Sequence, residues 1–209
     1  MTDPSQLPAT RTSLLQLRRQ LAETRQGYDL LERKREVLLH ELWGLFRELR
    51  DAESRVRARF EAAYRAQLEA RLTMGMERMR WAALAPPCRT LCSVRLRSVM
   101  GVPLPVVDLK VEPLPLPYSP AGVSVAFDRA SRVWTEVGEV LGPWIEAAGS
   151  FSLVSSELAK TQRRVSALKN LVIPRYEGGI SRIQAVLDEQ DREGFVRSKR
   201  AKDLQKPFR

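Results

Sequence analysis

The chain has little of what metal sites and disulfide frameworks are built from. Its 209 residues include one histidine, His40, and two cysteines, Cys88 and Cys92. A tetrahedral zinc site needs four ligands, and these three residues do not supply them. A disulfide between cysteines so close in sequence would remove little loop entropy, so we expect two reduced thiols. The sequence therefore predicts no metal site.

Motifs that hold phosphate or activate a nucleophile are also lacking. No Gly-x-x-x-x-Gly-Lys-Ser/Thr loop occurs, and the segment 178–181, GGIS, has no lysine and follows no predicted strand. No serine lies in a Gly-x-Ser-x-Gly elbow. The acidic cluster at 188–193 has the helical spacing of an ion-paired face, with a metal site as the less favoured reading. We therefore predict no catalytic residue and no cofactor.

Long apolar runs are missing as well. No stretch approaches the 18 or so consecutive apolar residues of a membrane-spanning helix. The first ten residues, MTDPSQLPAT, lack the basic and apolar pattern of a signal peptide. We expect a protein that stays in the compartment where it is made.

Proline is absent from residues 9–85, where apolar residues recur in steps of three and four. From Leu14 to Ala70 only Thr24, Arg35 and Arg59 interrupt this seam. A 3.5-residue period held this long predicts a coiled-coil helix, running to about Trp81. Sixty such residues would extend roughly 90 Å, which suits a protein that spans, spaces or transmits. The seam includes Leu31, Leu38, Leu42, Leu45 and Leu49.

Three glycines, Gly27, Gly44 and Gly75, lie inside this predicted helix. Each weakens a helix by about 1 kcal/mol relative to alanine. We therefore expect another segment to approach the backbone closely at these points.

Residues 86–120 hold eight of the thirteen prolines. Two extended runs, 91–99 and 104–111, flank a turn that includes Met100, Gly101 and Pro103, which predicts a β-hairpin. Prolines in the second arm predict an edge strand with unpaired positions. The segment 113–120, PLPLPYSP, is typical of extended or polyproline structure. An irregular linker is the alternative interpretation of the insert.

Residues 121–209 return to a helical pattern, with breaks or bends expected at Gly142-Pro143 and Pro174. The seam of this segment includes Val165, Leu168, Ile183 and Leu187, and its repeat slips by an extra residue near Pro174. The predicted fold is mainly α: a long antiparallel two-helix coiled coil with a central β-hairpin and proline-rich insert. The predicted divisions are a polar leader (1–10), a first helix (11–85), the insert (86–120) and a helical segment (121–209).

The formal net charge is +10. Residues 11–80 hold 16 basic and 11 acidic side chains, residues 151–209 hold 13 and 7, and residues 81–150 balance. Such a distribution favours acidic partners, although interspersed charges are also typical of a solvated helix face. A cytosolic coiled-coil scaffold and a basic nucleic-acid-associated protein therefore stay open as alternatives. Antiparallel helices would bring together a positive collar of Arg11, Arg18, Arg19, Arg197, Lys199, Arg200 and Lys202.

Several blocks of sequence resemble one family, in the same order along the chain. They are PATR at 8–11, LLQLRRQL at 14–21, GYDLLERKREVL at 27–38, VMGVPLP at 99–105 and the long block from Lys160 to Lys202. The long block includes RRVSAL and an Ile-Pro pair. The chain resembles the D subunits of V/A-type ATPases and ATP synthases, which form the central shaft of those machines.

The resemblance implies a rotor without catalytic residues of its own. Its partners would be the catalytic and non-catalytic subunits of the ATPase ring, the small F subunit of the central stalk, and a socket subunit on the membrane ion-translocating ring. The collar would lie within the ATPase ring. Because the predicted hairpin lies off the helix pair, we expect it to be a contact or regulatory element and not the part that carries torque. The resemblance further implies a cytoplasmic protein held at the membrane only through the complex, without nucleic acid and without direct membrane insertion.

Overall fold

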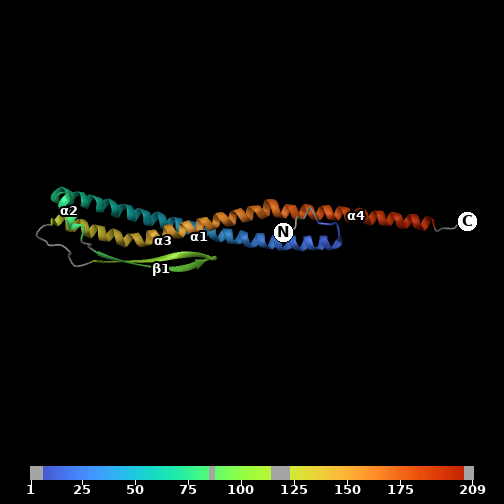
Figure 1. The fold of residues 1–209 in the computed structure, drawn as a ribbon, viewed down its shortest axis with the longest axis horizontal. Helices are drawn as coiled ribbons and strands as arrows, with labels where there is room; N and C mark the ends of the chain where they lie inside the picture. The colour runs from blue at the N-terminus through green and yellow to red at the C-terminus, as the bar shows by residue number, and fades with distance from the viewer. Residues whose placement is uncertain (1–6, 85–87, 114–122, 205–209) are drawn as a thin grey trace. The chain divides into compact units, whose positions relative to one another are not determined.

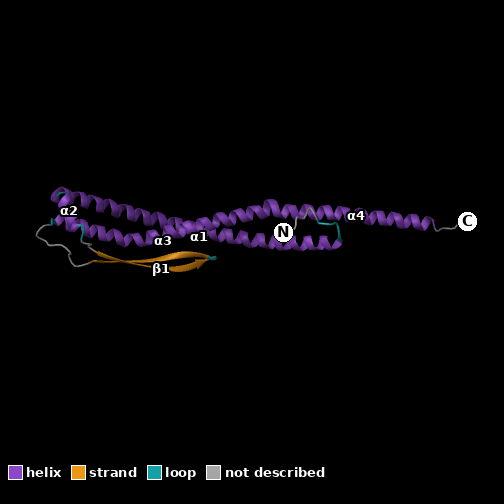
Figure 2. Cartoon of the chain, viewed as in Figure 1, coloured by secondary structure: helices purple, strands orange, loops and turns teal. Residues whose placement is uncertain are grey.

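The structure, a computed structural model, describes residues 7–84, 88–113 and 123–204 (Figures 1 and 2). The mainly helical architecture with a central two-stranded antiparallel hairpin confirms the predicted fold class. The predicted polyproline stretch after Pro113 and most of the polar leader lie outside the described residues. The elements in chain order are α1 (Arg11–Met74), α2 (Met76–Ala82), β1 (Cys88–Val99), β2 (Val102–Pro113), α3 (Val125–Ala167), the π-helical segment η3 (Leu168–Val172) and α4 (Ile173–Leu204).

Two compact units make up the chain, and α1 and α3 contribute to both of them. Unit 1 contains Met1–Glu36 and Ala159–Arg209, and unit 2 contains Val37–Leu158.

Helix α1 has a defined start and a defined end. The side chain of Thr10 caps the start, because its Oγ1 accepts a hydrogen bond from the backbone N–H of Ser13 at 3.1 Å. The helix ends at Met74 because Gly75 has a φ of 79°, which an α-helix does not allow. The prediction of one helix through Trp81 was therefore wrong, since α2 is a separate short helix.

The glycines of α1 do not have the role expected for them. No atom would lie within 4 Å of a Cβ added at Gly27, Gly44 or Gly75, so the predicted close approach was wrong. Close approach occurs instead at three glycines of α3. A Cβ at Gly138 would lie 2.8 Å from Cγ2 of Val111, one at Gly142 3.1 Å from Cβ of Leu109, and one at Gly149 3.3 Å from Cγ of Pro105.

In unit 1, α1 packs antiparallel against α4. Arg11 forms an ion pair with Asp191 at 3.1 Å, and Arg25 forms one with Glu177 at 2.7 Å. Fourteen residues separate the two partners on each helix, so the two helices stay in register between these pairs. The core between them consists of Leu17, Tyr176 and Ile183, with Leu14, Leu21, Val172, Ile180 and Leu187 packed against it.

The slip in the heptad pattern coincides with the π-helical segment η3. Pro174 has no N–H and cannot donate to the carbonyl of Asn170 as an α-helix requires. The preceding N–H, that of Ile173, bonds to the carbonyl of Leu168 five residues back. This single widened turn accommodates the proline and lets the helix continue into α4.

In unit 2, α1 packs antiparallel against α3. Arg59 forms an ion pair with Glu136 at 2.7 Å, and the hydroxyls of Thr73 and Ser124 lie 3.1 Å apart. A break or a bend was expected at Gly142-Pro143, and no break occurs there, because helix α3 continues through Pro143. One core cluster contains Leu38, Leu45, Val102, Leu104 and Val154, and a second contains Ala66, Ala70, Phe127 and Ala130.

The β-hairpin lies against α3 within unit 2, as Figure 1 shows. Its two-residue turn has φ values of 50° at Met100 and 80° at Gly101, as in a type I′ turn. The backbone N–H of Val107 donates to Oε2 of Glu146 on α3 at 2.9 Å. The predicted hairpin is thus confirmed, and its second strand is the one that meets the helix.

Alanine substitutions at two glycines of unit 2 should have opposite effects. Gly44→Ala should stabilise the fold by about 1 kcal/mol, because alanine favours a helix and nothing lies near the added methyl. Gly138→Ala should cancel that gain and cost about 1–3 kcal/mol, since the methyl would overlap Val111. Urea unfolding of both variants measures the difference. Equal stabilisation would show that the hairpin is not seated on Gly138.

Candidate interaction surfaces

The collar residues lie on two stretches of unit 1. The ion pair between Arg11 and Asp191 places the start of α1 beside the middle of α4. Residues 192–204 of α4 therefore extend beyond the start of α1. At 1.5 Å per residue, Arg197 lies roughly 9 Å beyond this pair, while Arg18 lies roughly 10 Å in the other direction. The two groups of cations share the helix pair but are spread along it.

Several collar cations already have acidic neighbours. Arg19 lies 3.7 Å from Glu23, and Arg197 lies 2.8 Å from Glu193. The remaining cations of the C-terminal group are exposed and form no ion pair within the described part of the chain. They are Lys199, Arg200 and Lys202.

The predicted seam residues are all buried or half-buried, and some of them lie in the core clusters of the two units. The buried ones are Leu38, Leu45, Val165 and Ile183, and the half-buried ones are Leu31, Leu42, Leu49, Leu168 and Leu187. Two of the polar residues that interrupt the seam make polar contacts instead. Arg35 pairs with Glu32 at 2.7 Å, and Arg59 pairs with Glu136.

The three predicted turn residues divide between two elements. Met100 and Gly101 form the turn, and Met100 is exposed at its tip. Pro103 belongs to β2, opposite Ser98. The strands are longer than the predicted runs and reach from Cys88 to Pro113.

A second apolar stripe on α1 in unit 2 was missed from the sequence. Leu39, Trp43 and Phe46 are exposed, and the rings of Trp43 and Phe46 meet edge to face at 6.1 Å. Their spacing of four and three residues, off the main seam, was the available signal. A separate aromatic cluster joins Phe60 and Tyr64 of α1 to Trp134 of α3. None of the helices in the described residues is both long and apolar enough to cross a membrane.

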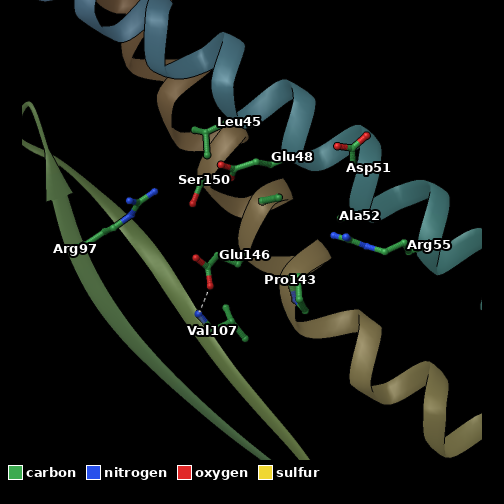
Figure 3. Close-up of a pocket in the computed structure, with 11 residues that line it drawn as sticks. Leu45, Glu48, Asp51, Ala52, Arg55, Arg97, Val107, Pro143, Glu146 and Ser150 are labelled. Carbon is green, nitrogen blue, oxygen red and sulfur yellow. Dashed lines mark hydrogen bonds between the residues drawn. The ribbon is translucent and has the colours of Figure 1, made fainter.

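A pocket of about 350 Å³ lies between α1, α3 and the hairpin in unit 2 (Figure 3). Ser150 is 1% exposed, and its hydroxyl has no hydrogen-bond partner among the described residues. The hydrogen bond between Val107 and Glu146 crosses the pocket and ties the hairpin edge to α3 (Figure 3). Charged side chains of both signs complete the lining: Glu48, Asp51, Arg55 and Arg97.

The described residues contain no group of three or more histidine, cysteine, aspartate or glutamate side chains placed to hold a metal ion. His40 is exposed, and Cys88 and Cys92 are free thiols. The acidic cluster of α4 is an ion-paired face, in which Glu189 lies 3.6 Å from Arg192.

Comparison with known proteins identifies the family of the chain. The family model that describes the D subunit of ATP synthase matches residues 13–203. The D subunit of the V-type ATP synthase of Thermotoga neapolitana is 35% identical over 194 residues, covering 93% of this chain and 96% of the relative. The D subunit of the A-type ATP synthase of Methanopyrus kandleri is 33% identical over 197 residues, covering 93% and 85%. That of Pyrococcus furiosus is 33% identical over 202 residues, covering 93% and 92%. The chain belongs to the family of ATP synthase D subunits.

Proposed function

We propose that this chain is the central-stalk rotor subunit of a V/A-type ATPase or ATP synthase. It transmits torque between the ATP-processing ring and the membrane ion-translocating ring, and it carries no catalytic site of its own. In this role it is cytoplasmic and held at the membrane only through the complex.

The observation that carries the proposal is the paired helix. Helix α1 is continuous for 64 residues and packs antiparallel against the returning helices within each unit. A helix pair transmits torque only if the two helices do not slide past each other. Buried leucines and ion pairs between helices, such as Arg25 with Glu177 and Arg59 with Glu136, oppose such sliding.

We place the catalytic and non-catalytic ring subunits around the terminal part of unit 1. The exposed cations on residues 192–204 of this part form a positive surface that acidic loops of a surrounding ring could contact. Because these cations extend beyond the start of α1, the ring would meet a single helix there.

The other two partners fit surfaces of unit 2. The small F subunit would bind the side of the helix pair at the stripe of Leu39, Trp43 and Phe46, which exposes apolar area on α1. The socket subunit would receive the end where α1 gives way to α2. Leu72 and Trp81 are strongly exposed there.

Rotation of the assembled complex tests the proposal. Ring subunits would be reconstituted with this chain carrying a bead on a cysteine introduced at exposed Leu72, after Cys88 and Cys92 are replaced by serine. Addition of ATP should produce stepwise rotation of the bead, and beads attached to rings that lack the chain should show none. A bead that stays still on rings that hydrolyse ATP would contradict the rotor assignment.

The isolated chain should not hydrolyse ATP. The sequence has no phosphate loop, and the described side chains form no metal-holding cluster. Incubation of the purified chain with ATP and Mg²⁺ should release phosphate at the rate of the buffer alone. Turnover that persists through successive purification steps and follows the amount of chain would contradict this prediction.

A further inference from the structure

The two edges of the hairpin differ in what covers them. The N–H of Val107 donates to Glu146 on α3, so it points away from β1. In an antiparallel pair, two residues opposite each other either both point their N–H and C=O groups toward the other strand or both point them away from it. The register is unbroken from Cys88 to Val99. The backbone groups therefore point away from β1 at positions 103, 105, 107, 109 and 111, and the N–H of Val107 meets α3.

The prolines of β2 follow this pattern. Pro103 and Pro105 occupy positions whose N–H would point away from β1, and Glu146 accepts the N–H of Val107. The glycines at 138, 142 and 149 leave room for the strand against α3. The edge formed by β2 is thus covered by a helix and deprived of donors, two ways in which proteins protect a strand edge.

Within the described residues, the edge formed by β1 has neither protection. Its positions 90, 92, 94, 96 and 98 are opposite the outward-facing positions of β2, so their N–H and C=O groups point away from the hairpin. Strand β1 contains no proline and is exposed from Arg89 to Ser98. Val94 is 59% exposed and Leu96 is 72% exposed. A 12-residue strand in this state is a template for another strand.

The positive charge of β1 indicates which kind of strand could pair with its free edge. Its only charged residues are Arg89, Arg95 and Arg97. Arg89 has Glu112 as its cross-strand neighbour, and Arg97 lies 3.8 Å from Glu41. Arg95 lies opposite Val106 and forms no ion pair within the described residues. A second copy of β1 would bring three more arginines to the same edge, and like charges in opposed strands are destabilising.

We propose that an acidic, extended segment of another protein adds to β1 as a third strand of the sheet. Its backbone hydrogen-bonds to positions 90–98 of β1, and its carboxylates lie beside Arg95 and its neighbours. Side chains on one face of the added strand cover Val94 and Leu96. This inference goes beyond the rotor assignment and does not depend on it.

The test uses the full chain and a blocked twelve-residue peptide of alternating glutamate and threonine. Amide exchange resolved by residue should slow at Thr90, Cys92, Val94, Leu96 and Ser98 when the peptide is present. The inward-facing amides of Ser93 and Arg95 should change little, because β2 already protects them. A peptide with lysine in place of glutamate should give no slowing.

Two variants separate strand addition from simple charge attraction. Leu96→Pro removes one outward N–H at a position whose cross-strand partner is itself Pro105, so the hairpin should persist. It should weaken binding of the acidic peptide about tenfold or more. Arg95→Glu should also weaken binding about tenfold or more, whereas Lys110→Glu on β2 should have a much smaller effect.

Three results would overturn the proposal. One is equal binding of the acidic and basic peptides. Another is binding of the acidic peptide without slower exchange of the outward-facing amides, or binding that is unchanged by Leu96→Pro while the hairpin remains folded. The third is slowing of those amides with rising concentration of the chain alone, which would assign the edge to a second copy.

Discussion

Replacing Leu45 by alanine should lower the free energy of unfolding by about 2–5 kcal/mol. Leu45 is 4% exposed and lies in one core cluster with Leu38, Leu104 and Val154. Those neighbours come from α1, β2 and α3, so the cavity left by the leucine has walls from three elements that cannot all move into it. Chemical denaturation of the full chain, followed by circular dichroism at 222 nm, measures the change.

Leu68→Ala is the matched control for Leu45→Ala. Leu68 is also on α1 in unit 2, but it is 56% exposed. Its truncation should change stability by about 0.5 kcal/mol or less, because little area is removed from the core. Equal losses in the two variants would show that Leu45 does not face a closed seam.

Reversing the charge of Arg197, Lys199 and Arg200 to glutamate should impair assembly with the ATPase ring and leave folding nearly unchanged. All three are exposed on the part of α4 that extends beyond α1. Exposed ion pairs contribute little to stability, so the melting temperature should move by no more than a few degrees. Loss of electrostatic steering should slow association with the ring about tenfold or more at low salt. Association rates at two salt concentrations check the prediction.

A second triple reversal distinguishes local charge from total charge. Arg50, Arg57 and Arg65 are exposed on α1 in unit 2, and their change to glutamate alters the net charge equally. Ring association of this control should remain close to that of the unmodified chain. Retention on immobilised DNA tests the nucleic-acid alternative with the same proteins. Normal ring assembly of the C-terminal variant at low salt would contradict a collar role.

Most of the helical architecture could be predicted because it depends on the spacing of apolar residues along the sequence. The seam from Leu14 to Ala70 and the slip before Pro174 depend on side chains three to four residues apart. The end of α1 was harder to predict. Both an unbroken helix and a break at Gly75 were consistent with a glycine at that position, and only its φ of 79° decided between them.

The surfaces were predicted less completely than the helices. The collar cations could be named, but their spacing along unit 1 depended on which residues pair across the helices. The contact between Arg11 and Asp191 set that spacing. The stripe of Leu39, Trp43 and Phe46 was present in the sequence as a second periodicity, although its exposure depended on where α3 and the hairpin pack.

The sequence by itself determined two antiparallel helical segments, a hairpin between them and the place of its turn at Met100-Gly101. Neighbouring residues specify all three, through heptad spacing, proline positions and the glycine of the turn. Only the tertiary structure decided which edge of the hairpin is covered and which is free. That choice arises where the glycines of α3 admit β2 and Glu146 accepts the N–H of Val107. Since these partners are 27 to 44 residues apart in the sequence, no local pattern could reveal it.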